Sequence, residues 1–459
     1  MKSTFAKVVS GLPATYADLR YEQNRKIRVV YEGKELSGVS TALTSGGHIR
    51  AYAEGGKAIA SFSDPDRADS IAANTCAAAA HVGRGREKKL RLASAPVVQE
   101  DFLLTPAKDP RVIPLSEKIE LATHYNHIIL QNPNVLTTQT VYDEFASRRI
   151  FVNSEGSIIE HELLNVGIVG MIVAKKGNVV QRVRFAFGGQ EDFSPLMGRD
   201  DDLKRQIEKA CELLDAEPAR AGNYPVVLDP SESGVFIHEA FGHLSEADGL
   251  QNNPSFRAKL QLGTELGRPI LNVSDDPSLP GLPGTYIIDD EGVRGAKTHL
   301  ITEGKLSGRL HSRETAAEFD EPLSGNMRAV DINFTPIVRM SNILIEKGDS
   351  TFDDMVSSID NGYYLVGAKG GQTSGDQFTF GAQWGYKIEN GRIAGMVRDI
   401  NMSGELFSTL QATSMIGDDV EFGERGGCGK GGGGPMQMNR KSGKGSPHIK
   451  IDAVTIGGI

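Results

Sequence analysis

The chain has 459 residues, too many for one ordinary hydrophobic core, so two domains are expected. Hydrophobic residues make up 39% and charged residues 24%, as in a globular protein, and the net charge of -9 argues against a general nucleic-acid binder. The longest apolar run, 166–174, is far too short to cross a bilayer, so we expect no membrane span.

The N-terminus and the cysteines point to the cytoplasm. No sustained apolar stretch precedes Pro13, so we expect no signal peptide. The chain contains 3 cysteines, which is too few for a disulfide framework in a protein of this length. A reducing compartment therefore fits best, and we expect a cytoplasmic protein.

The first half of the chain alternates predicted hairpins with predicted helices. Short glycine-containing connections at 32–34 and 54–57 predict hairpins over 27–39 and 49–62. A ladder of strands is expected over 150–187, with a turn at 175–178. Apolar residues at helical spacing predict three helices, over 66–81, 115–130 and 201–215.

A domain boundary is expected at Glu217–Tyr224, where Pro, Gly and Asn interrupt both periodicities. A strand at Val226–Leu228 and a short helix from about Gly234 follow it. Asn390-Gly391 indicates a type I′ hairpin, and the tail is expected to be extended as far as Val454. We predict an α+β protein of two domains. Residues 1–219 form a mixed α/β domain of sheet and helices, and residues 220–459 form a β-rich, mainly antiparallel domain.

The most informative segment contains His238, Glu239 and His243 in an HExxxH pattern. The common zinc-peptidase motif is HExxH, which places both histidines on one helical face. Here the extra residue rotates the second imidazole by roughly 140° from the first on an ideal helix. Both rings can reach one ion only if the helix widens, as in a π-bulge, or ends between them. Gly242, which precedes His243, is a residue that tolerates such a departure.

Cys428 is the candidate third ligand. Zinc in a catalytic site takes three protein ligands and keeps a fourth position open, and a thiolate suits zinc. Glu239, adjacent to His238, can act as the general base for water. Two alternatives stay open at this point. The histidines could belong to a plain buried helix, although their polar atoms would then need partners. Cys428 could be an exposed, inert thiol in a glycine loop.

These residues resemble the TldD/PmbA family of metallopeptidases. The likeness begins near Tyr16 and is strongest from Tyr224 onward, and Glu246 and Asp248 match an acidic pair after the family's HExxxH motif. Further matching blocks are 289–292, 324–326, 339–342, 385–389 and 428–430.

The resemblance implies a Zn²⁺ ion on His238, His243 and Cys428, with Glu239 catalytic. It also implies an N-terminal α+β domain and a C-terminal β-rich domain. Family members form dimers, so we expect a homodimer or a heterodimer with a TldE/PmbA-like subunit that lacks the motif. Their substrates are unfolded or leader-type peptides.

We therefore expect a zinc-dependent metallopeptidase that hydrolyses peptide bonds of unfolded or extended peptides. One alternative is a non-catalytic, zinc-containing peptide-binding subunit, which a fourth protein ligand on the metal would favour. The other is a hydrolase of small amides, which a narrow, closed cavity would favour over a cleft.

Overall fold

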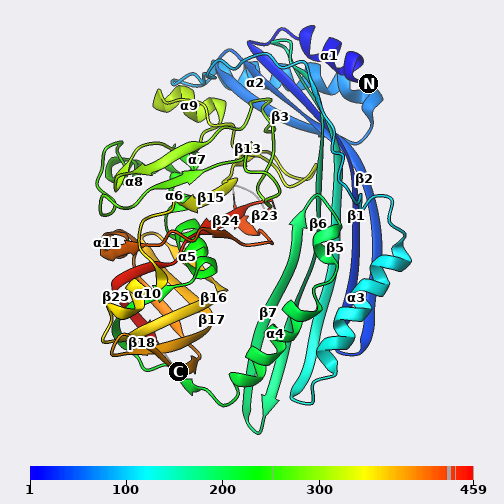
Figure 1. The fold of residues 1–459 in the computed structure, drawn as a ribbon. Helices are drawn as coiled ribbons and strands as arrows, with labels where there is room; N and C mark the ends of the chain where they lie inside the picture. Colours follow the sequence, from blue (N-terminus) through cyan, green and yellow to red (C-terminus); the bar gives the residue numbers. More distant parts are fainter. Residues whose placement is uncertain (252, 432–435, 440, 458–459) are drawn as a thin grey trace.

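A computed structural model describes residues 1–251, 253–431, 436–439 and 441–457 (Figure 1). The N-terminal half is built on one long, curved sheet with the strand order β3-β2-β1-β5-β6-β4, to which β7 adds by pairing with β6. Its strands are β1 (Tyr16–Glu32), β2 (Glu35–Ala53), β3 (Gly56–Phe62), β4 (Asp101–Phe102), β5 (Val135–Asn153), β6 (Ile158–Lys176) and β7 (Val179–Gln190).

Helices cover this sheet at two places. Near the N-terminus, α1 and α2 pack against the end of the sheet, whereas α3 and α4 lie along its length and share one core with β1, β5, β6 and β7 (Figure 1). The helices are α1 (Lys2–Ser10), α2 (Ala68–Arg84), α3 (Leu115–Leu130) and α4 (Asp200–Glu212), and short 3₁₀ turns occupy Pro65–Arg67 and Ser194–Leu196. The three helices expected from apolar spacing are confirmed.

The predicted hairpin turns are also confirmed, but the strands are longer than expected. The second strand of the hairpin predicted over 27–39 and the first strand of the one predicted over 49–62 are one continuous strand, β2. Strand β1 also begins earlier than predicted, at Tyr16. On β1, polar side chains such as Asp18, Arg20 and Glu22 alternate with apolar ones, yet both faces are buried. The strand was missed because its polar face contacts the C-terminal half instead of water.

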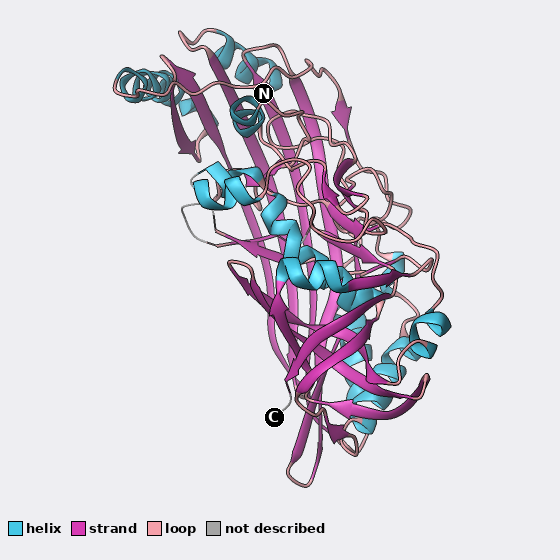
Figure 2. Cartoon of the chain, turned by 90° about the vertical axis from the view of Figure 1, so that its left-hand side faces the viewer, coloured by secondary structure: helices cyan, strands magenta, loops and turns pink. Residues whose placement is uncertain are grey.

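The C-terminal half combines two large sheets around a main core of residues between Ala219 and Ile456, and a smaller cluster lies around Met355 and Ile388 (Figure 2). One sheet has the order β16-β9-β25-β19-β17-β18-β8, with β20 on β25, and the other has the order β12-β11-β10-β15-β24-β21. Most pairings are antiparallel, as predicted, but β16–β9, β18–β8 and β15–β24 are parallel. At the predicted type I′ turn, Asn390 and Gly391 both have positive φ, 49° and 74°.

The strands of this half are β8 (Glu217–Pro218), β9 (Gly222–Leu228), β10 (Val273–Asp275), β11 (Thr298–Thr302), β12 (Lys305–Leu306), β13 (Met327–Arg328), β14 (Ile337–Val338), β15 (Asn342–Ile345), β16 (Asn361–Ser374), β17 (Gln377–Glu389), β18 (Arg392–Arg398), β19 (Asn401–Glu405), β20 (Thr413–Ile416), β21 (Glu421–Phe422), β22 (Cys428–Lys430), β23 (Gln437–Asn439), β24 (Gly443–Ser446) and β25 (Ile449–Gly457). Its helices are α5 (Pro230–Ile237), α6 (His243–Ser245), α7 (Ala247–Gln251), α8 (Pro254–Lys259), α9 (Arg313–Phe319), α10 (Phe352–Ser357) and α11 (Leu406–Ala412).

Residues 217–224, where we expect the domain boundary, contain β8 and the start of β9, and both strands belong to the C-terminal sheet. The division into 1–219 and 220–459 stays a prediction. Among the described residues, no helix combines the length and the apolar character needed to cross a bilayer.

Buried ion pairs join the two halves. Arg149 of β5 donates to Asp290 over 2.9 Å, and Arg20 of β1 lies 3.0 Å from the same carboxylate. Burial alone would raise the pKa of Asp290, but Arg20 and Arg149 hold it below its usual range. One carboxylate of the C-terminal half is thus fixed between two arginines of the N-terminal sheet.

Asp290→Asn should lower the free energy of unfolding by about 3–5 kcal/mol, because Arg20 and Arg149 would then share one buried carboxylate, Glu22, and one buried positive charge would be left uncompensated. The single tryptophan, Trp384, packs in the core of the N-terminal half, so its fluorescence during urea unfolding reports on this contact. Asp215→Asn, which removes an exposed pair with Lys176, is the control and should cost less than about 1 kcal/mol. Equal effects of the two substitutions would contradict the role of Asp290.

Candidate metal centre

The two histidines of the HExxxH pattern lie on a helix that changes its winding between them. Asp229 caps α5 by accepting a hydrogen bond from the Glu232 amide over 2.7 Å. The helix therefore begins at Pro230, earlier than the expected start near Gly234. After α5 the residues His238–Gly242 form a π-helical turn, and α6 follows. The predicted widening is confirmed, and it brings the two imidazole rings to a centroid separation of 5.3 Å.

Gly242 has a different role from the one expected. Its backbone is helical, with φ −53° and ψ −47°, so the turn makes no use of glycine's conformational freedom. A Cβ at this position would lie 2.1 Å from the Met340 sulfur and 2.9 Å from Ile343. Glycine is therefore required because β15 and the segment before it pack directly against the backbone of the histidine helix at this position. The sequence could not indicate this, since the contacting residues are distant in the chain.

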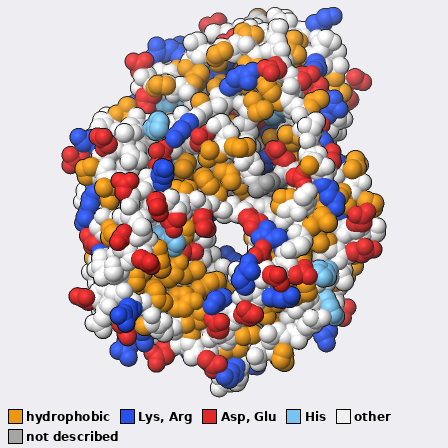
Figure 3. Space-filling view, in the orientation of Figure 1, with side chains coloured by type: hydrophobic (Ala, Val, Ile, Leu, Met, Phe, Trp, Pro, Cys, Tyr) orange, Lys and Arg blue, Asp and Glu red, His pale blue; other side chains and the backbone are white. Residues whose placement is uncertain are grey.

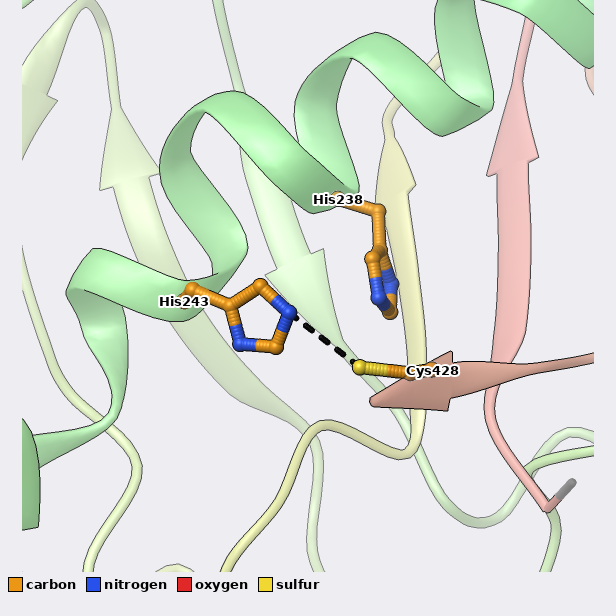
Figure 4. A group of neighbouring side chains, drawn as sticks. All are labelled: His238, His243 and Cys428. Carbon is orange, nitrogen blue, oxygen red and sulfur yellow. Dashed lines mark hydrogen bonds between the residues drawn. The ribbon is translucent and has the colours of Figure 1, made fainter. Parts of the chain in front are cut away.

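Cys428 meets the histidines from the opposite direction, at the start of β22 (Figure 4). Its Sγ lies 3.1 Å from the Nε2 atom of His243, and the candidate ligand atoms of His238, His243 and Cys428 all lie within 4.8 Å of one another. The side chain is only 4% exposed, so the alternative of an exposed, inert thiol is wrong. The structure thus brings together the three residues predicted as ligands.

Lys430 connects the cysteine strand to the histidine helix. Its ammonium group lies 3.0 Å from Glu246 and 2.6 Å from Asp248, and it donates to the Val338 carbonyl over 2.9 Å. Arg339 supports the same strand by donating to the carbonyl of Cys428 over 2.8 Å. Reasoning from the residues missed Lys430 and Arg339, although both lie in blocks that carried the family resemblance.

Glu246 orients the ring of His243. Its carboxylate lies 2.9 Å from Nδ1 of His243, which leaves Nε2 directed at the cysteine sulfur. Burial would raise the pKa of Glu246, but Lys430 and His243 hold it at about 2. Burial would likewise lower the pKa of His243, but Glu246 and Cys428 raise it to about 10. The acid is thus ionised and holds its partners by charge as well as by hydrogen bonds.

His238 is fully buried, and neither of its ring nitrogens has a hydrogen-bond partner among the described residues. Burial lowers its pKa well below the ordinary value, and the nearby charges of Lys444, His243 and Arg339 add to this. The ring is therefore neutral. A buried polar group without a hydrogen-bond partner destabilises the folded state, so the ring of His238 needs another partner. A neutral imidazole beside a second imidazole and a thiol is a set of ligands that fits a zinc ion.

Glu239 lies at the edge of the cluster and faces a cleft. Its carboxylate oxygens are 3.9 Å from Nε2 of His238 and 3.7 Å from Nε2 of His243. The cleft has a volume of about 900 Å³ and is lined by Glu239, Cys428, strands β5, β6 and β7, helix α4, and part of β16. Figure 3 shows an opening between the two halves of the molecule. Glu239 and Cys428 thus line the same cleft.

Models of one protein family match most of the chain. The PmbA/TldA metallopeptidase domain 1 matches residues 17–81, the central domain matches 108–216, and the C-terminal domain matches 221–458. The central and first domains of these models share the single N-terminal sheet.

Individual relatives agree with this assignment. A metalloprotease of Synechocystis sp. is 36% identical over 448 residues, which cover 97% of this chain and 95% of that protein. A zinc metalloprotease TldD homolog of Saccharolobus solfataricus is 32% identical over 320 residues, covering 69% and 70% of the two chains. The crystal structure of TldE from Thermococcus kodakarensis has the same fold, with a TM-score of 0.72 at 20% identity and 97% coverage of each chain. The chain therefore belongs to the PmbA/TldA metallopeptidase family and is a peptide-bond hydrolase.

Proposed function

We propose that this metallopeptidase uses zinc, bound by His238, His243 and Cys428, to cleave extended peptides, with Glu239 as the general base. The unpartnered, neutral ring of His238 beside His243 and Cys428 carries this proposal. The name of the Saccharolobus relative supports zinc as the metal.

Zinc at this position would supply a Lewis acid that polarises the scissile carbonyl and the attacking water. The two imidazoles would bind as neutral donors, so His243 would lose a proton when the metal binds, and the cysteine would bind as a thiolate. Because a thiolate donates more charge than an imidazole, the site activates water less strongly than a three-histidine site, and a base close to the ligands matters more.

Glu239 is placed to act as that base. Its side chain is 21% exposed, so it borders both the ligand cluster and the cleft. It takes the proton of the attacking water on its carboxylate and returns it to the leaving amine. The backbone of this residue is held in place by Thr373, whose hydroxyl donates to the Glu239 carbonyl over 3.1 Å.

The shape of the cleft supports an extended peptide as the substrate. The stretch 368–374 of β16 pairs with β17 on one side, whereas β9 contacts only residues 363–365 on the other. Ala368, Gly370 and Gly371 of this stretch line the cleft. A substrate strand can add to this edge through main-chain hydrogen bonds, with little reading of its side chains.

The two alternative functions have less support. A structural zinc site would be closed by a fourth protein ligand, but within the described ranges the cluster contains only two histidines and one cysteine. A small-amide hydrolase would need only a narrow, closed cavity, whereas the cleft beside Glu239 measures about 900 Å³.

We also propose a cytoplasmic dimer, formed by two copies or with a TldE/PmbA-like subunit. The TldE fold shared with the Thermococcus protein makes the mixed dimer structurally compatible. Neither nucleic acid nor a membrane is proposed as a partner.

Glu239→Gln should retain the metal and lower kcat by about 10²–10⁴-fold, since the amide cannot accept the water proton. Hydrolysis of an unfolded peptide and zinc content measured on the same sample test this. Glu162→Gln is the control, because Glu162 also follows a histidine in the sequence but pairs with Arg111 outside the site. Full activity of Glu239→Gln would exclude Glu239 as the base.

Cys428→Ser should reduce the zinc content of the purified protein well below that of the unmodified chain, because a serine hydroxyl is a poor zinc ligand. Elemental analysis after dialysis measures this. Cys211→Ser, which changes a half-buried cysteine of α4, is the matched control and should leave zinc content unchanged. Equal zinc in both variants would remove Cys428 from the site.

Glu246→Gln should weaken zinc binding by about 10–100-fold, because His243 loses the charged acceptor that fixes its ring. Competition with a chromophoric chelator measures the affinity. Glu321→Gln removes a similar carboxylate contact, 2.9 Å from the ring of His311, away from the cluster. That control should bind zinc normally, and equal weakening in both variants would argue for a general structural effect.

A further inference from the structure

A second cavity lies between the two halves of the molecule, apart from the proposed metal site. Its volume is about 330 Å³, and none of His238, Glu239, His243 and Cys428 lines it. Strands β1, β5 and β6 form one wall, and the segments 286–290 and 328–330 form the other. The hairpin strand β23 separates it from the cleft, since Met438 lines both spaces.

The acidic groups around this cavity are neutralised by their own partners. Asp290 lies between Arg20 and Arg149, as described above. Glu144 is paired with Arg25 over 2.6 Å and with Lys118 over 2.5 Å. These carboxylates therefore leave no excess negative charge on the cavity wall.

Asp289 also lines the cavity, but its carboxyl group is engaged by the main chain. Burial raises its pKa well above the usual value, and the neighbouring Glu291 raises it further. Its two oxygens accept hydrogen bonds from the amides of Glu291, Val293 and Met327.

Two buried cations on the same wall lack adequate counter-ions. Arg328 is 8% exposed, its Nη atoms donate only to the main-chain carbonyls of Lys441 and Met340, and its Nε has no partner among the described residues. Lys441 is 9% exposed, and within the described ranges its ammonium group reaches only Glu191, at 3.5 Å. Burial lowers the pKa of both groups. Buried cations without counter-ions raise the free energy of the folded protein, so binding of an anion between them would be favourable.

The rest of the wall is mainly apolar. Its apolar surface comes from Ile27, Phe145, Leu163, Tyr286, Ile288 and Met438, and polar side chains such as Asp143, His161 and Asn165 lie among them. A volume of about 330 Å³ lies at the small end of ligand pockets, so it suits a molecule of amino-acid size and excludes a polypeptide.

We infer that this cavity binds a small organic monocarboxylate, with the carboxylate between Arg328 and Lys441 and an apolar body against Tyr286, Ile288 and Met438. This inference goes beyond the proposed peptidase activity and does not depend on it. Because the wall comes from both halves of the molecule, a bound acid would also strengthen the contact between them.

Calorimetric titration of the full chain with 3-phenylpropionate, 3-phenylpropanamide and inorganic phosphate tests the ligand class. The acid should bind about tenfold or more tightly than the amide, which has the same shape but no charge. Equal affinities would overturn the role of the cations. Phosphate binding as tightly as the acid would overturn the apolar part of the site.

A metal ion could also take a carboxylate, so the titration is repeated after chelator treatment. Chelator treatment should leave the affinity for the acid unchanged, because none of the proposed metal-binding residues lines the cavity. Loss of binding together with the metal would place the acid in the cleft and overturn the inference, whatever the outcome for peptide hydrolysis.

Lys441→Met should weaken binding of the acid about tenfold or more and should not lower the melting temperature of the free protein, because it removes a poorly paired buried charge. Lys369→Met, which changes a half-buried lysine outside the cavity, is the matched control. Ala329→Leu fills part of the cavity while both cations are retained, and it should also abolish binding. Normal binding by both Lys441→Met and Ala329→Leu would refute the site.

Discussion

The contact between Lys430 and the acids that follow the HExxxH pattern is the constraint on which the proposed metal centre depends. The proposed sulfur ligand comes from a hairpin far along the chain, whose strands β22 and β23 form a small sheet of their own. Lys430 connects this hairpin to the histidine helix through Glu246 and Asp248, and Arg339 adds a hydrogen bond to the Cys428 carbonyl. Because Glu246 also holds the ring of His243, one buried charge cluster positions both the imidazole and the strand that carries the thiol.

The helix contributes the second part of the geometry. Five positions of a regular α-helix would turn His243 away from His238, whereas a π-helical turn returns both rings to one side. The sequence alone predicted either this widening or a helix end between the histidines, since the two rings can share an ion only in one of these ways, and the structure has the widening. It could not predict why Gly242 is needed, because the answer is the volume of Met340 across the core.

A similar limit explains the errors in the fold. Alternation of polar and apolar residues is normally taken to mean that one sheet face contacts water. On β1 the polar face carries Arg20 and Glu22, yet it is buried against the C-terminal half. The turns and helices were predictable because glycine, asparagine and apolar spacing act locally. The buried polar interface was not, because charges such as Arg20 and Arg149 are neutralised in part by Asp290, which lies in the other half.

The two halves therefore control different properties of the enzyme. His238, Glu239, His243 and Cys428 all belong to the C-terminal half, so the ligand cluster needs no side chain from the N-terminal sheet. The cleft, in contrast, takes one wall from β5, β6 and β7. The arginines that hold Asp290 thus act on the contact between the halves and not on the ligand cluster. The cluster around Lys430, in contrast, lies within the C-terminal half and positions the proposed ligands themselves.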